Sequence, residues 1–250
     1  MKKYDDIPAV RRSVLWEMRK SPAHCLYAAT HESEPTPALA FGTAAHKYVL
    51  EPETFWEEYV IAPEVNKRTK AGKEEWEQFQ AELEESGMTA ISQSDLDTIK
   101  EMYEAIKANP VAHDLLRNGD HEVPIQWTDP ITGERCKCRP DVLGKEFIVD
   151  YKTTTSCEDG SFERSCRYYG YKLQAAMYLE GVFNTKLEDK KFAFVAQEKS
   201  APYVVRVYYC DPGFIEEGAA LYRELMDKYH LCRVTDTWPG YEDKELLGDE

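Results

Sequence analysis

The sequence has no long apolar run. No segment approaches the ~20 consecutive apolar residues that a membrane-spanning helix needs. Residues 1–12, MKKYDDIPAVRR, contain basic side chains but neither an apolar centre nor a small-residue cleavage site, so they do not form a secretory signal. We therefore expect a cytoplasmic protein without membrane attachment.

Paired metal-ligand and nucleotide motifs are also missing. The seven cysteines are scattered, and the Cys136–Cys138 pair has no second close pair, whereas a tetrahedral zinc site needs two such pairs or a Cys/His set. We expect reduced structural thiols. The segment KAGKEEW, residues 70–76, lacks the spacing of a phosphate-cradling P-loop, so no nucleotide triphosphate is expected as a ligand.

Positive charge is scarce. Lys and Arg total 31 against 46 Asp and Glu, which gives a formal net charge of -15. This balance argues against a nonspecific nucleic-acid binder, since such binding rests on neutralised phosphates. A cleft or ring can still be positive inside and negative outside. The distribution of charge therefore matters more than its sum.

One segment concentrates basic side chains. They fall within seven positions, at Lys67, Arg68, Lys70 and Lys73. A flexible loop of this kind, with Gly72 inside it, can contact phosphates. The alternative is a solvated charge run that the following glutamates neutralise.

The pattern of the chain predicts one unit of 250 residues in the α/β (α+β) class. Residues 1–12 are expected to be loose, 13–120 mainly helical, 121–232 a sheet-containing core, and 233–250 an acidic tail. Expected helices cover 13–27, 38–50, 74–85, 92–108, 111–117, 168–183 and 212–232. Expected strands cover 122–127, 135–143, 146–152, 191–198 and 203–210. A polar linker is expected at 31–37 and a basic loop at 66–73.

Charged residues interrupt two of these strands. Asp141 follows Arg139-Pro140, and Asp150 lies nine residues later inside the apolar segment FIVDYK. Asp150 and Lys152 are two positions apart, so both face one side of their strand. A turn at Gly144 can bring Asp141 and Asp150 to the same level on neighbouring strands.

Two close carboxylates repel each other unless a cation lies between them. Mg²⁺ prefers oxygen ligands and keeps several waters, and a nearby lysine can orient or deprotonate one of them. This inventory suits metal-assisted phosphodiester hydrolysis. The plain alternative is a hairpin ion pair between Lys152 and one of the aspartates.

The order of motifs extends the pattern. FGTAAH, RPDVL, IVDYKT and YKLQAAMY follow one another and together resemble the PD-(D/E)XK nuclease superfamily, in the branch with an upstream histidine and a downstream Q-x-x-x-Y helix. The segments SPAHCLYA, NKRTKAGKEEW, CKCRPD, DYKTT, YKLQAAMYLEG and WPGY are similar to the phage-type RecE family, the nuclease half of exonuclease VIII. The similarity runs from about Ser13 to Tyr241.

The resemblance implies a fold and an activity. The fold would be the PD-(D/E)XK core, a central mixed sheet flanked by helices, with a helical N-terminal part. The activity would be a 5′→3′ exonuclease on linear double-stranded DNA that releases 5′-mononucleotides and leaves a 3′ single strand. The alternatives are an endonuclease or single-strand nuclease of the same superfamily, and a non-catalytic module that binds DNA ends or loads a recombinase.

The resemblance also implies a setting. It suggests a phage or prophage protein in the cytoplasm of a bacterial host, beside a single-strand annealing protein of the RecT type. It further suggests a ring of three or four copies with DNA in the channel.

The site residues follow from the same resemblance. His46, Asp141 and Asp150 would hold one or two Mg²⁺ or Mn²⁺ ions with the backbone carbonyl of Tyr151, and Lys152 would act on the attacking water. An imidazole ligand suits Mn²⁺ better than Mg²⁺. Many superfamily members have glutamate where Asp150 stands.

Each flanking residue has another interpretation. His46 can be a core histidine at a helix interface that Gly42 and neighbouring alanines make thin. Gln174 and Tyr178 support the site or touch DNA, or they form a plain helix–sheet contact. Glu122 is either a further acid of the site or, as we favour, a surface charge or a partner of Arg139.

Further residues are candidates for the DNA path. They are Arg164, Arg167 and Lys172 in the same cleft, Arg11 and Arg12 at a terminal 5′-phosphate, and Phe55, Trp56 and Trp76 for stacking on bases. For the aromatic residues, burial in the core is the alternative.

Overall fold

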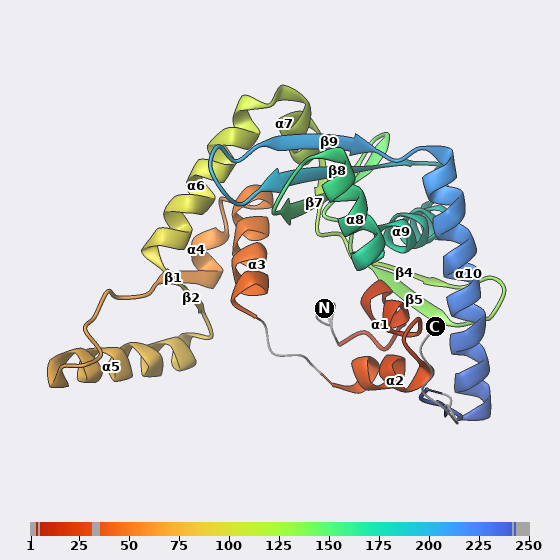
Figure 1. Cartoon of the computed structure of the whole chain (residues 1–250), viewed down its shortest axis with the longest axis horizontal. Helices are drawn as coiled ribbons and strands as arrows, with labels where there is room; N and C mark the ends of the chain where they lie inside the picture. The colour runs from red at the N-terminus through yellow and green to blue at the C-terminus, as the bar shows by residue number, and fades with distance from the viewer. Residues whose placement is uncertain (1–3, 5, 32–35, 242, 244–250) are drawn as a thin grey trace, which may run out of the picture.

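The computed structural model describes residues 4, 6–31, 36–241 and 243. Its centre is a five-stranded mixed sheet in the order β3-β6-β7-β8-β9 (Figure 1). The strands are β3 (Gly119–His121), β6 (Val142–Gly144), β7 (Phe147–Thr154), β8 (Lys191–Glu198) and β9 (Val205–Tyr209). Strands β7 and β8 are parallel, and the other neighbours are antiparallel. The predicted central mixed sheet is confirmed.

Ten helices and two small sheets complete the described part of the chain. The helices are α1 (Arg12–Glu17), α2 (Pro22–Thr30), α3 (Pro37–Leu50), α4 (Phe55–Glu58), α5 (Lys70–Ser86), α6 (Gln93–Ala108), α7 (Pro110–Arg117), α8 (Asp159–Tyr169), α9 (Tyr171–Lys186) and α10 (Pro212–Thr235). The small sheets pair β1 (Tyr59–Ile61) with β2 (Thr89–Ile91) and β4 (Ile125–Thr128) with β5 (Arg135–Cys138). Among the described helices, none is both long and apolar enough to cross a bilayer.

Helices cover both faces of the central sheet. Ile148 of β7 packs in a cluster with residues of α9 and α10, whereas Val149 and Tyr151 pack with residues of α3, α6 and α7. Side chains alternate along a strand, so Asp150 and Lys152 share the Ile148 face and turn toward α9. Strand β7 therefore carries apolar residues on both faces and charged residues at two positions, Asp150 and Lys152.

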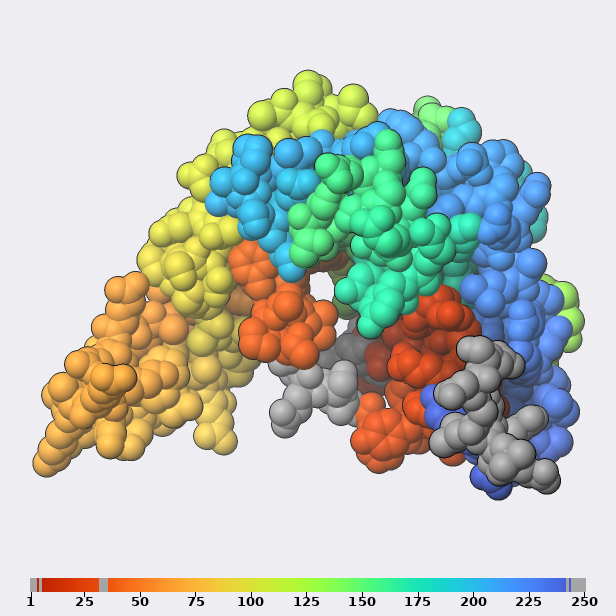
Figure 2. Space-filling model, in the orientation of Figure 1, coloured from red at the N-terminus to blue at the C-terminus, as the bar shows by residue number. Residues whose placement is uncertain are grey.

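The helical N-terminal part forms an arm beside this core. Figure 1 shows β1, α5 and β2 leading away from α3 and α6 toward one extremity of the molecule. In the space-filling view an opening separates α3 from α1 and α8 (Figure 2). The molecule therefore has the outline of an arch rather than of a compact globule.

Two prolines divide elements that were expected to be continuous. The expected helix over 13–27 is two helices, because Ser21 caps a new helix that has Pro22 in its first turn. The expected strand over 135–143 is also two strands, β5 and β6, which belong to different sheets. The break falls at Pro140, which has no N–H to donate to a ladder. Asp141 lies in this break, not at the end of a continuous strand.

Other boundaries were wrong in smaller ways. The expected basic loop over 66–73 ends at Thr69, whose side chain caps α5, so Lys70 and Lys73 are helical. Helix α8 and the short strands β1, β2 and β3 were missed. The expected helix over 92–108 with its Ser92 cap is confirmed as α6.

The cysteines are part of the packing. All seven lie in the described part of the chain as free thiols, and all but Cys210 are buried. Burial raises the pKa of the Cys25 and Cys136 thiols to about 12. These cysteines are inert thiols of the core, as expected.

Candidate active site

A cleft of about 670 Å³ opens where α3, β7 and α9 meet the N-terminal segment. Its wall includes the charged residues that the sequence singled out on β7 together with residues of α3 and α9. On the α3 side Gly42 faces Thr153 of β7, where a Cβ would lie at an ordinary contact distance of 3.5 Å from Thr153 Oγ1. Helix α3 therefore lies beside the strand that carries Asp150.

Asp141 connects three elements. It is 7 % exposed, and its Oδ2 lies 2.7 Å from Nε2 of His46 on α3. The same oxygen accepts a 2.7 Å hydrogen bond from the backbone N–H of Tyr151 on β7. Asp141 is therefore fixed although it lies outside any strand.

Asp150 is the most deeply buried charge of the site, with 1 % exposure. Its Oδ1 contacts Lys152 Nζ, and its Oδ2 accepts a hydrogen bond from the Gln174 amide on α9. Gln174 Oε1 is buried and, within the described residues, has no hydrogen-bond donor, whereas Asp150 Oδ1 has the Lys152 ammonium as its partner. A buried acceptor that lacks a donor is costly unless a cation or a polar ligand satisfies it.

Glu122 also belongs to the site. Its Oε2 lies 2.6 Å from Arg139 Nε, as expected, but its Oε1 lies 3.6 Å from Nδ1 of His46. Ligand atoms of His46, Glu122 and Asp141 lie within 4.8 Å of one another, a spacing that can hold a metal ion. Sequence reasoning favoured a surface charge or a partner of Arg139 over a further acid of the site. A left-handed backbone at Glu122, with φ 51°, aims the residue inward and cannot be read from the sequence.

Three acids, Glu122, Asp141 and Asp150, lie close together in the cleft. Burial, followed by repulsion from Asp141, raises the pKa of Asp150 to about 6 and that of Glu122 to about 7. Burial alone would lower the pKa of His46, but the adjacent Asp141 charge raises it overall. Burial would raise the pKa of Asp141, but His46 lowers it overall. A cation in the cleft would relieve the repulsion that these shifts report.

The donor set fits a divalent cation. Carboxylate oxygens suit Mg²⁺ and Mn²⁺, and the imidazole of His46 favours Mn²⁺. In an extended strand the N–H and C=O of one residue point to the same edge. Because the Tyr151 N–H faces Asp141, the Tyr151 carbonyl faces the site too. The Tyr151 side chain points the other way, where its hydroxyl donates a 2.6 Å hydrogen bond to Gln197.

The Q-x-x-x-Y pair lies in the cleft as predicted. Gln174 holds Asp150, and Tyr178 lines the wall beside it. Arg11 and Arg12 line the same cleft from the N-terminal side. The structure thus brings His46, Asp141, Asp150, Lys152 and this helix pair together; their roles remain predictions.

Lys172 lies elsewhere, contrary to expectation. It pairs with Glu217 of α10, and its ammonium lies 5.3 Å from the centre of the Phe214 ring. On helix α9 it stands one position after Tyr171, so it faces away from the cleft-lining positions. Arg164 and Arg167 are exposed on α8 and are not among the described residues that line the cleft.

The basic segment lies on the arm. Lys67, Arg68, Lys70 and Lys73 are exposed near the start of α5, away from the cleft (Figure 1). Lys67 lies 3.1 Å from the centre of the half-buried Trp76 ring, and Lys70 lies 3.8 Å from Glu74.

Two other aromatic candidates differ in exposure. Trp56 is 48 % exposed, whereas Phe55 is fully buried and stacks on Tyr59, so stacking of Phe55 on bases was the wrong prediction.

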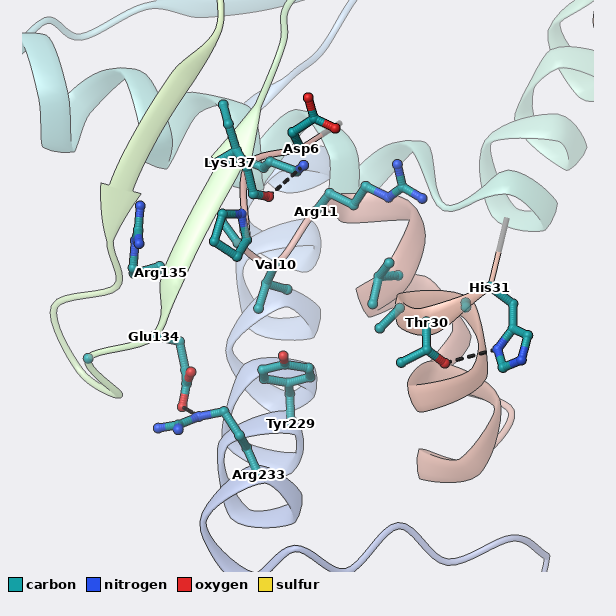
Figure 3. Close-up of a pocket in the computed structure, with 17 residues that line it drawn as sticks. Asp6, Val10, Arg11, Thr30, His31, Glu134, Arg135, Lys137, Tyr229 and Arg233 are labelled. Carbon is teal, nitrogen blue, oxygen red and sulfur yellow. Dashed lines mark hydrogen bonds and ion pairs between the residues drawn. The ribbon is translucent and has the colours of Figure 1, made fainter. Parts of the chain in front are cut away.

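A second cavity, of about 720 Å³, lies between the N-terminal segment, α2, β5 and α10 (Figure 3). Its buried charges are already satisfied. Lys137 donates to the carbonyls of Tyr4 and Ile7, and Glu134 accepts from Arg233 and contacts His230. Figure 3 shows Glu134 and Arg233 pointing toward each other. The hydrogen bonds and ion pairs around this cavity therefore connect elements of the fold. The candidate active site is the smaller cleft.

Comparison with known proteins agrees with this fold. The profile of the PDDEXK-like domain of unknown function (DUF3799) matches residues 12–247. A search of curated proteins found no match.

Two solved structures are similar to the chain. A crystal structure at 2.19 Å of a "Putative exonuclease" from Eubacterium rectale covers 97% of this chain and 90% of that one, with 16% identity and a TM-score of 0.66. At this identity the likeness shows a shared fold. A crystal structure of SSO0001 covers 88% and 93% of the two chains with 13% identity and a TM-score of 0.31, which is too low to support an argument.

The raised pKa values predict proton-linked metal binding. Asp150 and Glu122 titrate near pH 6 and 7 in the ion-free protein, and each must lose its proton to act as a ligand. We expect Mn²⁺ affinity to be at least about tenfold weaker at pH 5.5 than at pH 7.5, since each unit below a ligand's pKa costs about tenfold. Isothermal titration calorimetry measures this. Asp150→Asn should weaken Mn²⁺ binding and reduce its dependence on pH. Equal Mn²⁺ affinity of the wild-type chain at both pH values would contradict the assignment of these acids as ligands.

Proposed function

We propose that this chain, which belongs to the PDDEXK-like family DUF3799, is a metal-dependent nuclease that digests linear double-stranded DNA from its 5′ ends. One observation carries the proposal. His46 lies on α3, Asp141 lies in the break before β6, and Asp150 and Lys152 lie on β7. All four line one cleft that is open to solvent.

A structural ion pair accounts poorly for this arrangement. Each acid has one basic partner: Lys152 contacts Asp150, His46 contacts Asp141, and Arg139 contacts Glu122. Even so, burial and the charge of Asp141 keep the pKa values of Asp150 and Glu122 raised. Acids held this close in a buried site destabilise the folded protein, and raised pKa values of this kind are typical of functional sites.

The residues of the cleft have different proposed roles. His46, Asp141, Asp150 and the Tyr151 carbonyl would hold the ion, and Gln174 fixes the rotamer of Asp150. When bound, Mg²⁺ or Mn²⁺ would stabilise negative charge on the scissile phosphate and make water more acidic. Lys152, held by Asp150 with its ammonium 5.0 Å from the centre of the Tyr171 ring, would orient the attacking water through a hydrogen bond.

The number of ions is part of the proposal. Asp141 belongs to a ligand group with His46 and Glu122, and it also accepts a hydrogen bond from the N–H of Tyr151, the residue after Asp150. A shared carboxylate is suited to one or two ions. His46 makes Mn²⁺ at least as good an activator as Mg²⁺.

The finer features of the function rest on the resemblance to the RecE family. They are the 5′→3′ polarity, the release of 5′-mononucleotides, the action beside a single-strand annealing protein of the RecT type, and the ring of three or four copies. Endonuclease or single-strand activity on the same site, and end binding without cutting, are the alternatives.

Digestion of end-labelled DNA tests this function. Linear duplex labelled at its 5′ or its 3′ ends, closed circular duplex and linear single strands are incubated with Mn²⁺, Mg²⁺ or EDTA. We expect early release of 5′-labelled mononucleotide, intact circles and no reaction in EDTA. Cut circles would instead show an endonuclease, and binding without hydrolysis under any condition would refute the nuclease.

Replacement of Lys152 tests the division of roles. Lys152→Ala should lower kcat by about 10²–10⁴, the range for loss of a positioned acid–base group, with little change in DNA affinity. Lys186→Ala, at the exposed far end of α9, is the matched control and should leave both unchanged. If Lys152→Ala and the control variant had comparable kcat, Lys152 would have no role in the chemical step.

Charge reversal on the arm tests the DNA path. If Lys70 and Lys73 contact phosphates, their joint replacement by glutamate should weaken binding and reduce the slope of log K against log salt by about 2. The matched control reverses two exposed lysines outside the arm. They are Lys145, directly after β6, and Lys186, the last residue of α9. An unchanged slope in the Lys70/Lys73 variant would place DNA away from the arm.

A further inference from the structure

Aromatic rings form a row from the core to solvent beside the cleft. Phe194 is buried in the sheet and stacks on Tyr171, with centroids 5.2 Å apart. Tyr171 stacks on Tyr169 at 5.9 Å with an interplanar angle of 22°, and Tyr169 meets Tyr168 edge-on at 4.8 Å. Exposure rises along this row, from 1% at Phe194 and 7% at Tyr171 to 51% at Tyr169 and 75% at Tyr168.

The row is held by a tight corner between two helices. Gly170 ends α8 and precedes α9 with φ +70°, a conformation that favours glycine. A Cβ at Gly170 would lie 2.5 Å from the Trp16 ring, so α1 closes against the corner. Tyr169 and Tyr171 flank this glycine, so the corner keeps their rings together and leaves the outer face of Tyr169 open to solvent.

The row leads into the candidate active site. Tyr171 lines the cleft, with Lys152 Nζ 5.0 Å from its ring centre. The carbonyl of Tyr169 accepts a 3.0 Å hydrogen bond from Arg12, which lines the same cleft. Tyr169 is outside the cleft lining, so a flat group that stacked on it would lie beside the cleft, separated from Lys152 by the Tyr171 ring.

Basic side chains stand near the row, although α8 also carries Asp159, which pairs with Arg206, and the exposed Glu163. Arg164 and Arg167 are exposed on α8, the helix that ends in the two tyrosines, and Arg12 lies at the cleft. Exposed rings beside cations match a ligand that has flat apolar faces and a negatively charged backbone. Single-stranded nucleic acid has both features.

We propose that Tyr168 and Tyr169 form a stacking platform for unpaired bases of the DNA strand that is being cut. The proposal rests on the nuclease function above and deepens it. Bases in a duplex stack on their own neighbours, so the ring of Tyr169 can take a base only after the end has opened. The enzyme therefore acts on an end whose last nucleotides are separated from the complementary strand.

A base-deletion cycle tests the platform. Binding of fluorescein-labelled oligo(dT) and of an abasic oligonucleotide of equal length is measured by anisotropy in EDTA, where no cutting occurs. The wild-type chain should prefer oligo(dT). Tyr169→Ala should lose about 5- to 100-fold in affinity for oligo(dT), the range for one stacked base, and nothing for the abasic strand.

Two variants control for the ring and for exposure. Tyr169→Phe keeps the ring and should bind oligo(dT) as the wild-type chain does. Tyr209→Ala removes a tyrosine of similar exposure, 56%, from β9, outside the described cleft lining, and should change nothing. Equal losses on both oligonucleotides for Tyr169→Ala, or no loss on either, would overturn the platform.

A parallel digestion of 5′-labelled duplex separates this proposal from the nuclease function. If the wild-type chain cuts DNA but Tyr169→Ala shows no base-dependent loss, the platform fails and the nuclease stands. If no variant cuts DNA but the loss depends on the bases, the platform stands and the nuclease fails.

Discussion

The placement of two carboxylates in one buried site is the constraint on which the rest of the structure depends. Asp150 is 1% exposed and Asp141 7% exposed, and the charge of Asp141 adds to burial in raising the pKa of Asp150. Holding them together requires partners. Lys152 comes from the same strand as Asp150, whereas His46 on α3 and Gln174 on α9 come from helices on the two faces of the sheet.

The layers of the fold explain how these partners reach one point. Helices α3, α6 and α7 pack on one face of the sheet, and α9 and α10 pack on the other. The charged positions of β7 interrupt an otherwise apolar face, so the cleft is rigid where the ion is proposed to bind. The arm and the tyrosine platform lie outside this packed part, where a long ligand can be reached (Figures 1 and 2).

The sequence was sufficient for the contacts that local rules determine. The two-residue period of β7 placed Asp150 and Lys152 on one face, and helix spacing placed Gln174 and Tyr178 together on α9. It was not sufficient where tertiary geometry decides. The inward turn of Glu122 depends on a left-handed backbone, and the pairing of Lys172 with Glu217 depends on how α10 crosses α9. The break at Pro140 was visible in the sequence, but the assignment of β5 and β6 to different sheets was not.

The most direct test of the account is to locate a cation in the cleft. Crystals grown with Mn²⁺ and measured near the manganese absorption edge would show each bound ion as an anomalous peak. The account predicts a peak in contact with Asp141 and Asp150, with His46 or Glu122 beside it, and loss of the peak in Asp141→Ala. Anomalous density only at surface carboxylates, with Lys152 still paired to Asp150 in a cleft filled by water alone, would contradict it.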